Sequence, residues 1–255
     1  MKEKNDILFG FHSVYEALKA HKRNFYKILI SKKRSLSRME NIETLARERN
    51  IQIQAVDPEF LDRMTDFSNH QGLVAKTSFF PVKKASEVVM LVQEKKAPCF
   101  ILILENIEDP HNLGALIRTA LCAGVDYILV PKDRSAVPSS TVSRSSAGAM
   151  EHADIYMITN TASILRSLKE NGVWISGLDA DGDTSLFNAD LTGNIALVIG
   201  GEHKGIRPLV KKECDFLLSI PNIGLDIGQN IGKVNSLNAS VAGGIAMYEA
   251  LRQRT

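Results

Sequence analysis

Short apolar runs and helical patterns alternate along residues 98–255. The apolar runs are continuous, which is typical of strands that are buried on both faces. We expect strands at residues 100–104, 127–130, 155–157, 173–178, 195–199 and 216–220. Apolar residues at helical spacing predict helices at residues 113–123, 162–170, 208–214 and 234–253. This alternation predicts an α/β fold with a parallel sheet that is covered on both faces.

Residues 1–80 combine shorter apolar patterns with more charge. They predict helices within residues 7–20, 37–50 and 59–64, and strands at residues 26–30, 51–56 and 72–80. We therefore expect a small α/β domain over residues 1–80. Residues 81–97 carry lysine pairs at both ends and predict a linker with one short helix, so that the second domain spans residues 98–255.

The end of the chain reads as a strand, a glycine-rich loop and a helix. Apolar residues at spacings of three and four predict one helix face, made of Leu237, Val241, Ile245, Tyr248 and Leu251. Polar residues at the helix start are placed to hold an anion or a polar cofactor group, namely Asn235, Ser236 and Asn238. Two adjacent glycines, 243 and 244, cost roughly 1 kcal/mol each relative to alanine, which predicts that another backbone packs close against this helix. The alternative is an ordinary capped helix.

Composition bounds the class of protein. Hydrophobic residues make up 44% and charged residues 24% of the chain, as in ordinary globular proteins. The longest apolar runs are far shorter than the roughly 20 residues of a membrane span, and the N-terminus does not resemble a signal peptide. Three scattered cysteines lack metal-ligand spacing and fit a reducing compartment. We expect a cytoplasmic protein without a metal site.

Positive charge is concentrated near the N-terminus. Residues 1–80 carry 14 Lys and Arg against 10 Asp and Glu, a balance of +4, whereas the whole chain carries +2. A basic module of this kind indicates contact with a polyanion such as RNA. The candidate RNA-binding residues are Lys22, Arg23, Lys32, Lys33 and Arg34. The alternative is a solvated lysine face.

Several standard motifs are missing. No G-x-G-x-x-G follows the first strand of the second domain, so a nicotinamide site is unsupported. Residues 200–205 and 228–233 approach a phosphate loop, but each lacks the required Lys-Ser/Thr pair or its spacing. The acidic residues 179, 181 and 183 lack the glycine and the glutamate of a calcium loop. These observations argue against an NTPase and a calcium protein.

Polar residues follow three of the predicted strands. Asn112 and Arg118 follow residues 100–104, Glu202 follows residues 195–199, and Ser236 and Asn238 follow residues 216–220. Open α/β sheets bind ligands beyond the carboxyl ends of their strands, so these three groups predict one site.

Taken together, the three groups resemble the motifs of the SpoU (TrmH-like) family of SPOUT RNA 2′-O-ribose methyltransferases. The first motif is similar to residues 109–120 (DPHNLGALIRTA) and the second to residues 197–206 (LVIGGEHKGI). The third is similar to residues 220–221 (IP) followed by residues 236–242 (SLNASVA). The N-terminal residues 9–14 and 70–72 are similar to the substrate-binding domain of the family. The likeness is greatest to the branch that methylates a guanosine ribose in large-subunit ribosomal RNA.

The resemblance implies a C-terminal trefoil knot, a homodimer with the active site at its interface, and S-adenosylmethionine as cofactor. It places the cofactor near Gly200, Gly201, Ile220 and Leu237. It assigns catalysis to Asn112, Arg118, Glu202, Ser236 and Asn238. A guanidinium is always charged, which favours Arg118 as an electrostatic stabiliser, with Glu202 as the alternative base.

The sequence departs from the family pattern in two places, at His203–Lys204 and at an insertion over residues 225–233 beside the expected cofactor pocket. Two further functions stay open. One is a transfer RNA 2′-O-methyltransferase, and the other is a non-catalytic RNA-binding or ribosome-assembly protein on the same scaffold. The target nucleotide is not readable from the chain.

Overall fold

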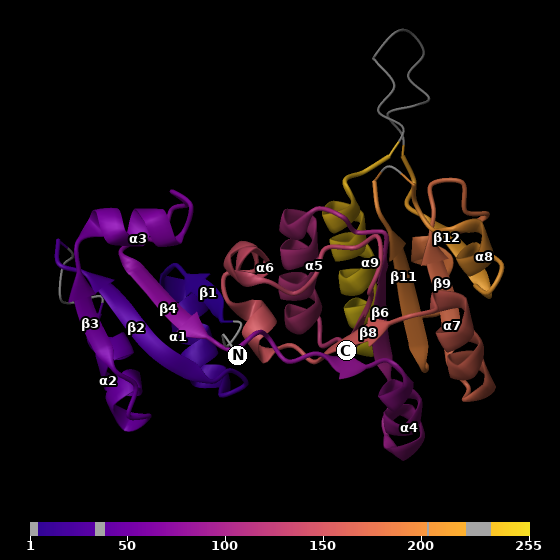
Figure 1. Cartoon of the computed structure of the whole chain (residues 1–255). Coiled ribbons are helices and arrows are strands. Elements are labelled where there is room, and N and C mark those ends of the chain that lie inside the picture. Colours follow the sequence, from indigo (N-terminus) through magenta and orange to yellow (C-terminus); the bar gives the residue numbers. More distant parts are fainter. Residues whose placement is uncertain (1–4, 34–38, 203, 223–235) are drawn as a thin grey trace, which may run out of the picture. The chain divides into compact units, whose positions relative to one another are not determined.

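The chain forms two compact units in the computed structural model, which describes residues 5–33, 39–202, 204–222 and 236–255. The first unit comprises Met1–Pro81 together with Pro138–Ala153, and the second comprises Val82–Val137 together with Asp154–Thr255. Each unit has its own sheet (Figure 1). The expected residues Arg34, Asn235 and the insertion at 225–233 lie outside the described ranges.

The first unit is built on a mixed sheet with the strand order β1-β4-β2-β3. Its strands are β1 (Asp6–Phe9), β2 (Phe25–Ser31), β3 (Ile53–Val56) and β4 (Leu73–Thr77). Two helices, α1 (Phe11–Ala20) and α2 (Glu40–Glu48), pack on one face through the cluster around Ile28 and Ala75. The opposite face carries α3 (Pro58–Met64), whose Leu61 packs on Leu29 and Val74. The α/β character predicted for this region is confirmed.

Residues 138–153 belong to the first unit. The sequence predicted instead that all of residues 98–255 lie in the second domain. Residues 138–153 form α6 (Ser140–Ser145) and the short helix η2 (Ala149–His152). Arg23 is 1% exposed, and it donates to both carboxylate oxygens of Glu151 at 2.8 and 3.1 Å and to Asp6 at 2.7 Å. Removing one partner of a buried ion pair costs about 3–5 kcal/mol. This pairing of distant residues fixes the segment and leaves no periodic signal in the sequence.

Residues 82–97 are an integral part of the second unit, so the linker predicted over residues 81–97 is wrong. Their strand β5 (Lys83–Lys84) pairs with β8 (Ile155–Ile158) at the edge of the larger sheet. The helix α4 (Ser86–Glu94) was expected, and it buries Val88 and Val92 in the core of this unit. The apolar residues of the segment therefore have partners in the second unit, which a linker would lack.

The second unit contains a sheet of eight parallel strands among the residues described. Across the sheet these are β10 (Thr184–Ser185), β12 (Phe216–Ser219), β9 (Trp174–Leu178), β11 (Ile195–Gly200), β6 (Phe100–Glu105), β7 (Tyr127–Pro131), β8 and β5. All six predicted strands are present within one or two residues of the expected bounds. The predicted parallel sheet is confirmed.

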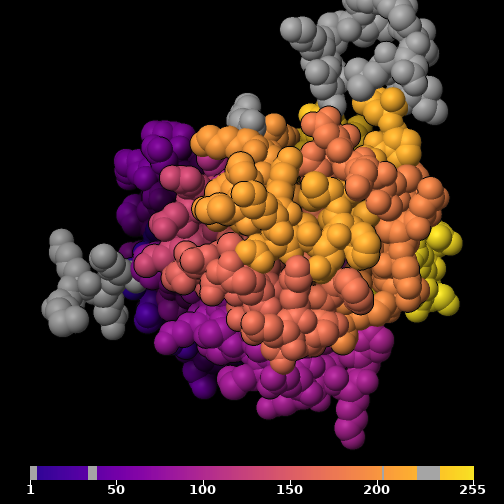
Figure 2. Space-filling view, turned by 90° about the vertical axis from the view of Figure 1, so that its right-hand side faces the viewer, coloured from indigo at the N-terminus to yellow at the C-terminus, as the bar shows by residue number. Residues whose placement is uncertain are grey.

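Helices cover both faces of this sheet, as predicted. On one face, α4, α7 (Thr161–Glu170) and α8 (Pro208–Lys211) bury their apolar residues in a common cluster. Figure 2 shows this side, where the orange segment that contains α8 lies against α7. On the other face, α5 (Pro110–Cys122) and α9 (Ala239–Arg254) pack side by side (Figure 1). The remaining short helix is η3 (Leu186–Asn188).

Small residues form the buried face of α9, so the helix face that was predicted to be buried is wrong. Alanines 239, 246 and 250 are buried with Gly243 and Met247. From the predicted stripe, Leu237, Val241 and Tyr248 are 42%, 50% and 51% exposed. Helical spacing alone does not say which side of a helix is buried when both sides carry apolar residues.

Another element packs closely at Gly243, but through side chains and not through the backbone that the sequence predicted. A Cβ atom at this position would overlap Leu116 of α5 and lie 2.7 Å from Cδ1 of Ile199 in β11. A Cβ atom at Gly244 would meet only Cγ2 of Thr119, at an ordinary 3.9 Å. The first glycine therefore sets how closely α9 approaches the sheet and α5.

We predict opposite effects of alanine at these two glycines. Overpacking at Gly243→Ala costs about 1–3 kcal/mol, which exceeds the gain of up to about 1 kcal/mol in helix propensity. Gly244→Ala is the matched control and keeps only the gain in propensity. Urea unfolding of both variants measures the difference in their free energies of unfolding. An unchanged or raised stability of Gly243→Ala would contradict the packing described.

Candidate active site

The three polar groups predicted from the sequence meet at the carboxyl ends of β6, β11 and β12. Asn112 lies in the first turn of α5, a helix that begins at Pro110 and is capped by Asp109, whose carboxylate accepts from His111 N at 2.9 Å. Asn238 is the N-cap of α9, and its Oδ1 accepts from the backbone N–H groups of Ser240 and Val241 at 2.9 and 3.3 Å. These caps fix both side chains at helix starts, where backbone donors are exposed.

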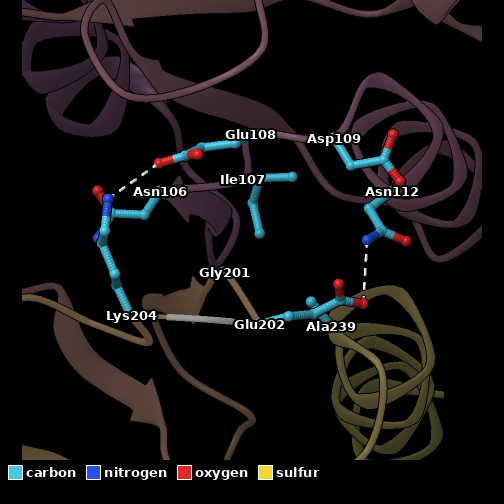
Figure 3. Close-up of a pocket in the computed structure, with 9 residues that line it drawn as sticks. All are labelled: Asn106, Ile107, Glu108, Asp109, Asn112, Gly201, Glu202, Lys204 and Ala239. Carbon is cyan, nitrogen blue, oxygen red and sulfur yellow. Dashed lines mark hydrogen bonds and ion pairs between the residues drawn. The ribbon is translucent and has the colours of Figure 1, made fainter.

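Glu202 is the acceptor that links the three segments. Its Oε1 accepts from Nδ2 of Asn112 at 3.1 Å and also from Nδ2 of Asn238. The same Nδ2 of Asn238 lies 3.2 Å from Oδ1 of Asn112. Figure 3 shows Asn112 pointing from α5 toward the carboxylate of Glu202. Hydrogen bonds to a carboxylate are roughly twice as strong as neutral ones, so this group joins α5, α9 and the loop after β11.

The loop after β11 is held in place by backbone contacts that require glycine. A Cβ atom at Gly201 would overlap the carbonyl oxygen of Asn106, and one at Gly200 would overlap the backbone of Gly205. Gly201 and Gly205 form an isolated antiparallel bridge. Asn106, with φ 56°, donates from Nδ2 to the carbonyl oxygen of Gly205 at 3.1 Å. The loop that carries Glu202 is therefore anchored to the end of β6.

Two polar residues that hold the segments around the site were not predicted from the sequence. Glu105 is fully buried at the end of β6, where it pairs with Arg207 and accepts from the hydroxyl of Thr161 at 2.9 Å. Asn106 follows it and holds the loop described above. The sequence did carry a signal, since a polar residue and an asparagine directly follow an apolar strand. Asparagine tolerates a positive φ better than most residues, so this pattern indicates a tight turn at the end of the strand.

All four predicted cofactor residues line one cavity of about 450 Å³. Its wall is formed by the ends of β9, β11 and β12 and by the segment that leads into α9. Apolar groups come from Leu178, Ile199, Ile220, Leu237 and Ala242, and polar groups from Asp179, Ser219, Asn222 and Ser236. Gly200 and Gly201 expose their backbone to it. This size and mixture are typical of a cofactor site.

A second cavity of about 300 Å³ adjoins the first and shares Gly201, Glu202 and Ala239 with it. Its other walls come from residues 106–109, Asn112 and Lys204 (Figure 3). Nζ of Lys204 pairs with Glu108 at 3.4 Å on one side, and Asn112 contacts Glu202 on the other. Glu202 therefore faces two adjacent spaces, as expected for a group between two ligands.

Arg118 is not part of this cluster in one copy of the chain. It is exposed on α5, lines neither cavity, and takes part in none of the hydrogen bonds or ion pairs found among the described residues. Six residues after Asn112, it lies about 9 Å further along the helix and about 120° around it. Arg118 therefore lies apart from the other predicted catalytic residues in this structure.

Four of the five predicted RNA-binding residues are described, and they divide into three groups. Arg23 is buried in its ion pairs, so its assignment to RNA binding is wrong. Nζ of Lys22 donates to the carbonyl oxygens of His152 and Ala153 at 3.0 and 2.8 Å. Lys32 and Lys33 are exposed and stay candidates, although they pair with Asp57 and Glu59 at 3.1 and 3.8 Å.

Other site chemistries find little support in the part of the chain that the structure describes. No group of three or more His, Cys, Asp or Glu residues there is placed to hold a metal ion. Burial raises the pKa of the Cys214 thiol to about 12, so this cysteine stays protonated and is no nucleophile. None of the described helices is long and apolar enough to cross a membrane.

Two family descriptions match nearly the whole chain. Residues 99–248 match the SpoU rRNA methylase family. Residues 7–82 match the domain described as RNA 2′-O ribose methyltransferase substrate binding. The two matched regions contain all three groups of the site and, apart from β5 and the first residue of β1, the strands of both sheets.

Several relatives match the chain over nearly its whole length. The chain is 36% identical over 254 residues to the 23S rRNA (guanosine-2′-O-)-methyltransferase RlmB of Xanthomonas campestris, covering 100% of this chain and 99% of that protein. The protein of the same name in Escherichia coli is 36% identical over 251 residues, covering 98% and 100%. A putative TrmH family tRNA/rRNA methyltransferase, YacO of Bacillus subtilis, is 38% identical over 254 residues, covering 100% and 98%.

Solved structures share the fold. The SpoU methyltransferase AviRb from Streptomyces viridochromogenes, in complex with the cofactor AdoMet, superimposes with a TM-score of 0.79 at 23% identity, covering 98% of this chain and 90% of that one. An rRNA methyltransferase from Sinorhizobium meliloti gives a TM-score of 0.77 at 21% identity, covering 100% and 89%. With both domains matched and full-length relatives above 30% identity, the chain belongs to the SpoU rRNA methylase family.

Proposed function

We propose that this protein transfers a methyl group from S-adenosylmethionine to the 2′-hydroxyl of a ribose in 23S-type ribosomal RNA. The nucleoside that carries this ribose is a guanosine. The observation that carries the proposal is the convergence of Asn112 and Asn238 on Glu202 between two adjacent cavities. The names of the full-length relatives support the ribosomal guanosine as substrate. The name of the Bacillus subtilis relative keeps transfer RNA as the second candidate.

The larger cavity fits the cofactor. Leu178, Ile199 and Leu237 offer apolar surface for a flat ring system, and the backbone at Gly200 and Gly201 offers hydrogen bonds without a side chain in the way. When bound, S-adenosylmethionine supplies an electrophilic methyl group on a sulfonium. Ser236 and Ile220 belong to the same wall and would bind it.

The smaller cavity would take the ribose. Asn112 and Asn238 hold one oxygen of Glu202 in place, which leaves the other carboxylate oxygen to accept a hydrogen bond from the 2′-hydroxyl. A carboxylate at this position orients the hydroxyl and takes up its proton. Arg118 remains charged throughout, so its part is to stabilise the oxyanion or to hold a neighbouring phosphate.

We further propose that the protein works as a cytoplasmic homodimer whose C-terminal segment forms a trefoil knot. Exposed apolar residues on α9, Val241 and Tyr248, supply a surface for a second copy. Arg118 is exposed on the neighbouring helix α5, and in a dimer it would reach the Glu202 cluster of the other copy. The tight backbone approach at Gly200 and Gly205 supports a threaded chain.

We predict that Arg118→Ala lowers the turnover of methyl transfer by about 100-fold or more, since loss of one charge-stabilising group has that effect in other enzymes. The assay follows transfer from S-adenosylmethionine to transcribed 23S ribosomal RNA, with ribose methylation mapped by position. Arg166→Ala is the control, because Arg166 is also an exposed arginine on a helix of this unit. Turnover of Arg118→Ala within about tenfold of the unmodified protein would contradict the role.

Mixing two inactive variants tests whether the site is shared between copies. Glu202→Gln is expected to be inactive, because an amide cannot take up the proton. If Arg118 acts on the Glu202 of the other copy, a heterodimer of Arg118→Ala and Glu202→Gln contains one intact site. About a quarter of all sites are then active after random exchange of subunits. No recovery in a mixture shown by mass to contain heterodimers would contradict action across the interface.

A further inference from the structure

A basic groove lies on the α3 face of the sheet in the first unit. It has a volume of about 650 Å³ and is lined by residues of β2, β3, β4 and α3. Leu29 and Val74 on this face pack against Leu61 of α3, which covers part of the sheet. Lys27 and Lys76 follow the same alternation as Leu29 and Val74, so they lie on this face, and both line the groove.

Lys27 and Lys76 are direct neighbours across two strands. They are register partners in the antiparallel pair of β2 and β4, and both are half-buried. Like charges at directly opposite positions destabilise a sheet. Among the described residues, neither lysine forms an ion pair or a side-chain hydrogen bond with a carboxylate. Two neighbouring cations without a compensating acid among the described residues form a place where an anionic partner would relieve the repulsion.

The helix α3 adds a third cation and an aromatic ring to the same groove. Arg63 is exposed, and no ion pair within the described ranges includes it. Phe60 lines the groove and is 43% exposed, so part of its ring is open to a ligand. The acidic residues at the groove, Asp57 and Glu59, are engaged by Lys32 and Lys33 at its edge. The positive charge of Lys27, Lys76 and Arg63 therefore stays uncompensated.

We propose that this groove binds an unpaired segment of the RNA substrate, with phosphates on Lys27, Lys76 and Arg63 and a base stacked on Phe60. The inference rests on the proposed function and names the surface that would hold the substrate. Grooves that combine backbone-binding cations with an exposed ring are the usual means of binding single-stranded nucleic acid. An acidic protein segment would also match the cations, but every nucleotide of an unpaired RNA offers both a phosphate for the cations and a flat base for Phe60.

The test compares binding of the full-length protein and its variants to an unpaired RNA of about 16 nucleotides and to a duplex of equal length. We expect Lys27→Ala/Lys76→Ala to weaken binding of the unpaired RNA by about tenfold or more, and to lower the slope of log affinity against log salt by about 1.4. Phe60→Leu should weaken the same binding by about tenfold without changing that slope. The duplex should bind more weakly than the unpaired RNA.

The control is Lys19→Ala/Arg47→Ala, which removes two exposed cations from α1 and α2 on the opposite face. It should leave the affinity and the salt slope unchanged. The groove variant should melt at the same or a higher temperature than the unmodified protein, because the repulsion between Lys27 and Lys76 is gone. Equal losses in both double variants, unchanged RNA binding of the groove variant, or equal binding of duplex RNA would overturn the proposal.

Methyl transfer is measured in parallel, so that a wrong assignment of the groove can be distinguished from a wrong proposed function. If the unmodified protein methylates ribosomal RNA and the groove variant has an unchanged KM for that RNA, the groove assignment is wrong and the proposed function stands. If the unmodified protein transfers no methyl group while the groove variants lose RNA affinity, the proposed function is wrong and the groove stands.

Discussion

One oxygen of Glu202 accepts hydrogen bonds from two asparagines that lie 126 residues apart in the chain. Each asparagine stands at the start of a helix, and each helix covers the same face of the parallel sheet. The contact therefore holds only if β6 and β11 are neighbours and α5 and α9 pack side by side. The hydrogen bonds of Glu202 therefore form only when the strands and helices of the second unit are correctly assembled.

Glycine makes this geometry possible. Side chains at Gly200 or Gly201 would collide with the backbone of neighbouring loops, and one at Gly243 would overlap the side chains of Leu116 and Ile199. Asn106 performs the complementary task, since its backbone adopts a positive φ while its amide holds Gly205. The same close approach that brings Glu202 to the asparagines also leaves bare backbone along the larger cavity. The close approach of the backbone therefore both positions Glu202 and keeps the larger cavity open for a cofactor.

The sequence predicted the strands of the second unit well, because strands buried on both faces produce continuous apolar runs that few other structures share. It predicted the convergence of Asn112, Glu202 and Asn238 through the strand ends that they follow. It did not predict that residues 138–153 belong to the first unit, because the ion pair of Arg23 with Glu151 joins distant positions without any period. It also chose the wrong face of α9, since its buried side consists of small residues with a weak hydrophobic signal.

The central claim is that Asn112 and Asn238 act as one unit through Glu202, which a double-mutant cycle on methyl transfer measures directly. Asn112→Ala removes one donor, and Asn238→Ser removes the other while it keeps a helix cap. Residues that act as a unit are strongly non-additive. We predict that the double variant turns over about as slowly as the slower single variant. Losses that multiply in the double variant would show that the asparagines act independently, and would contradict the account.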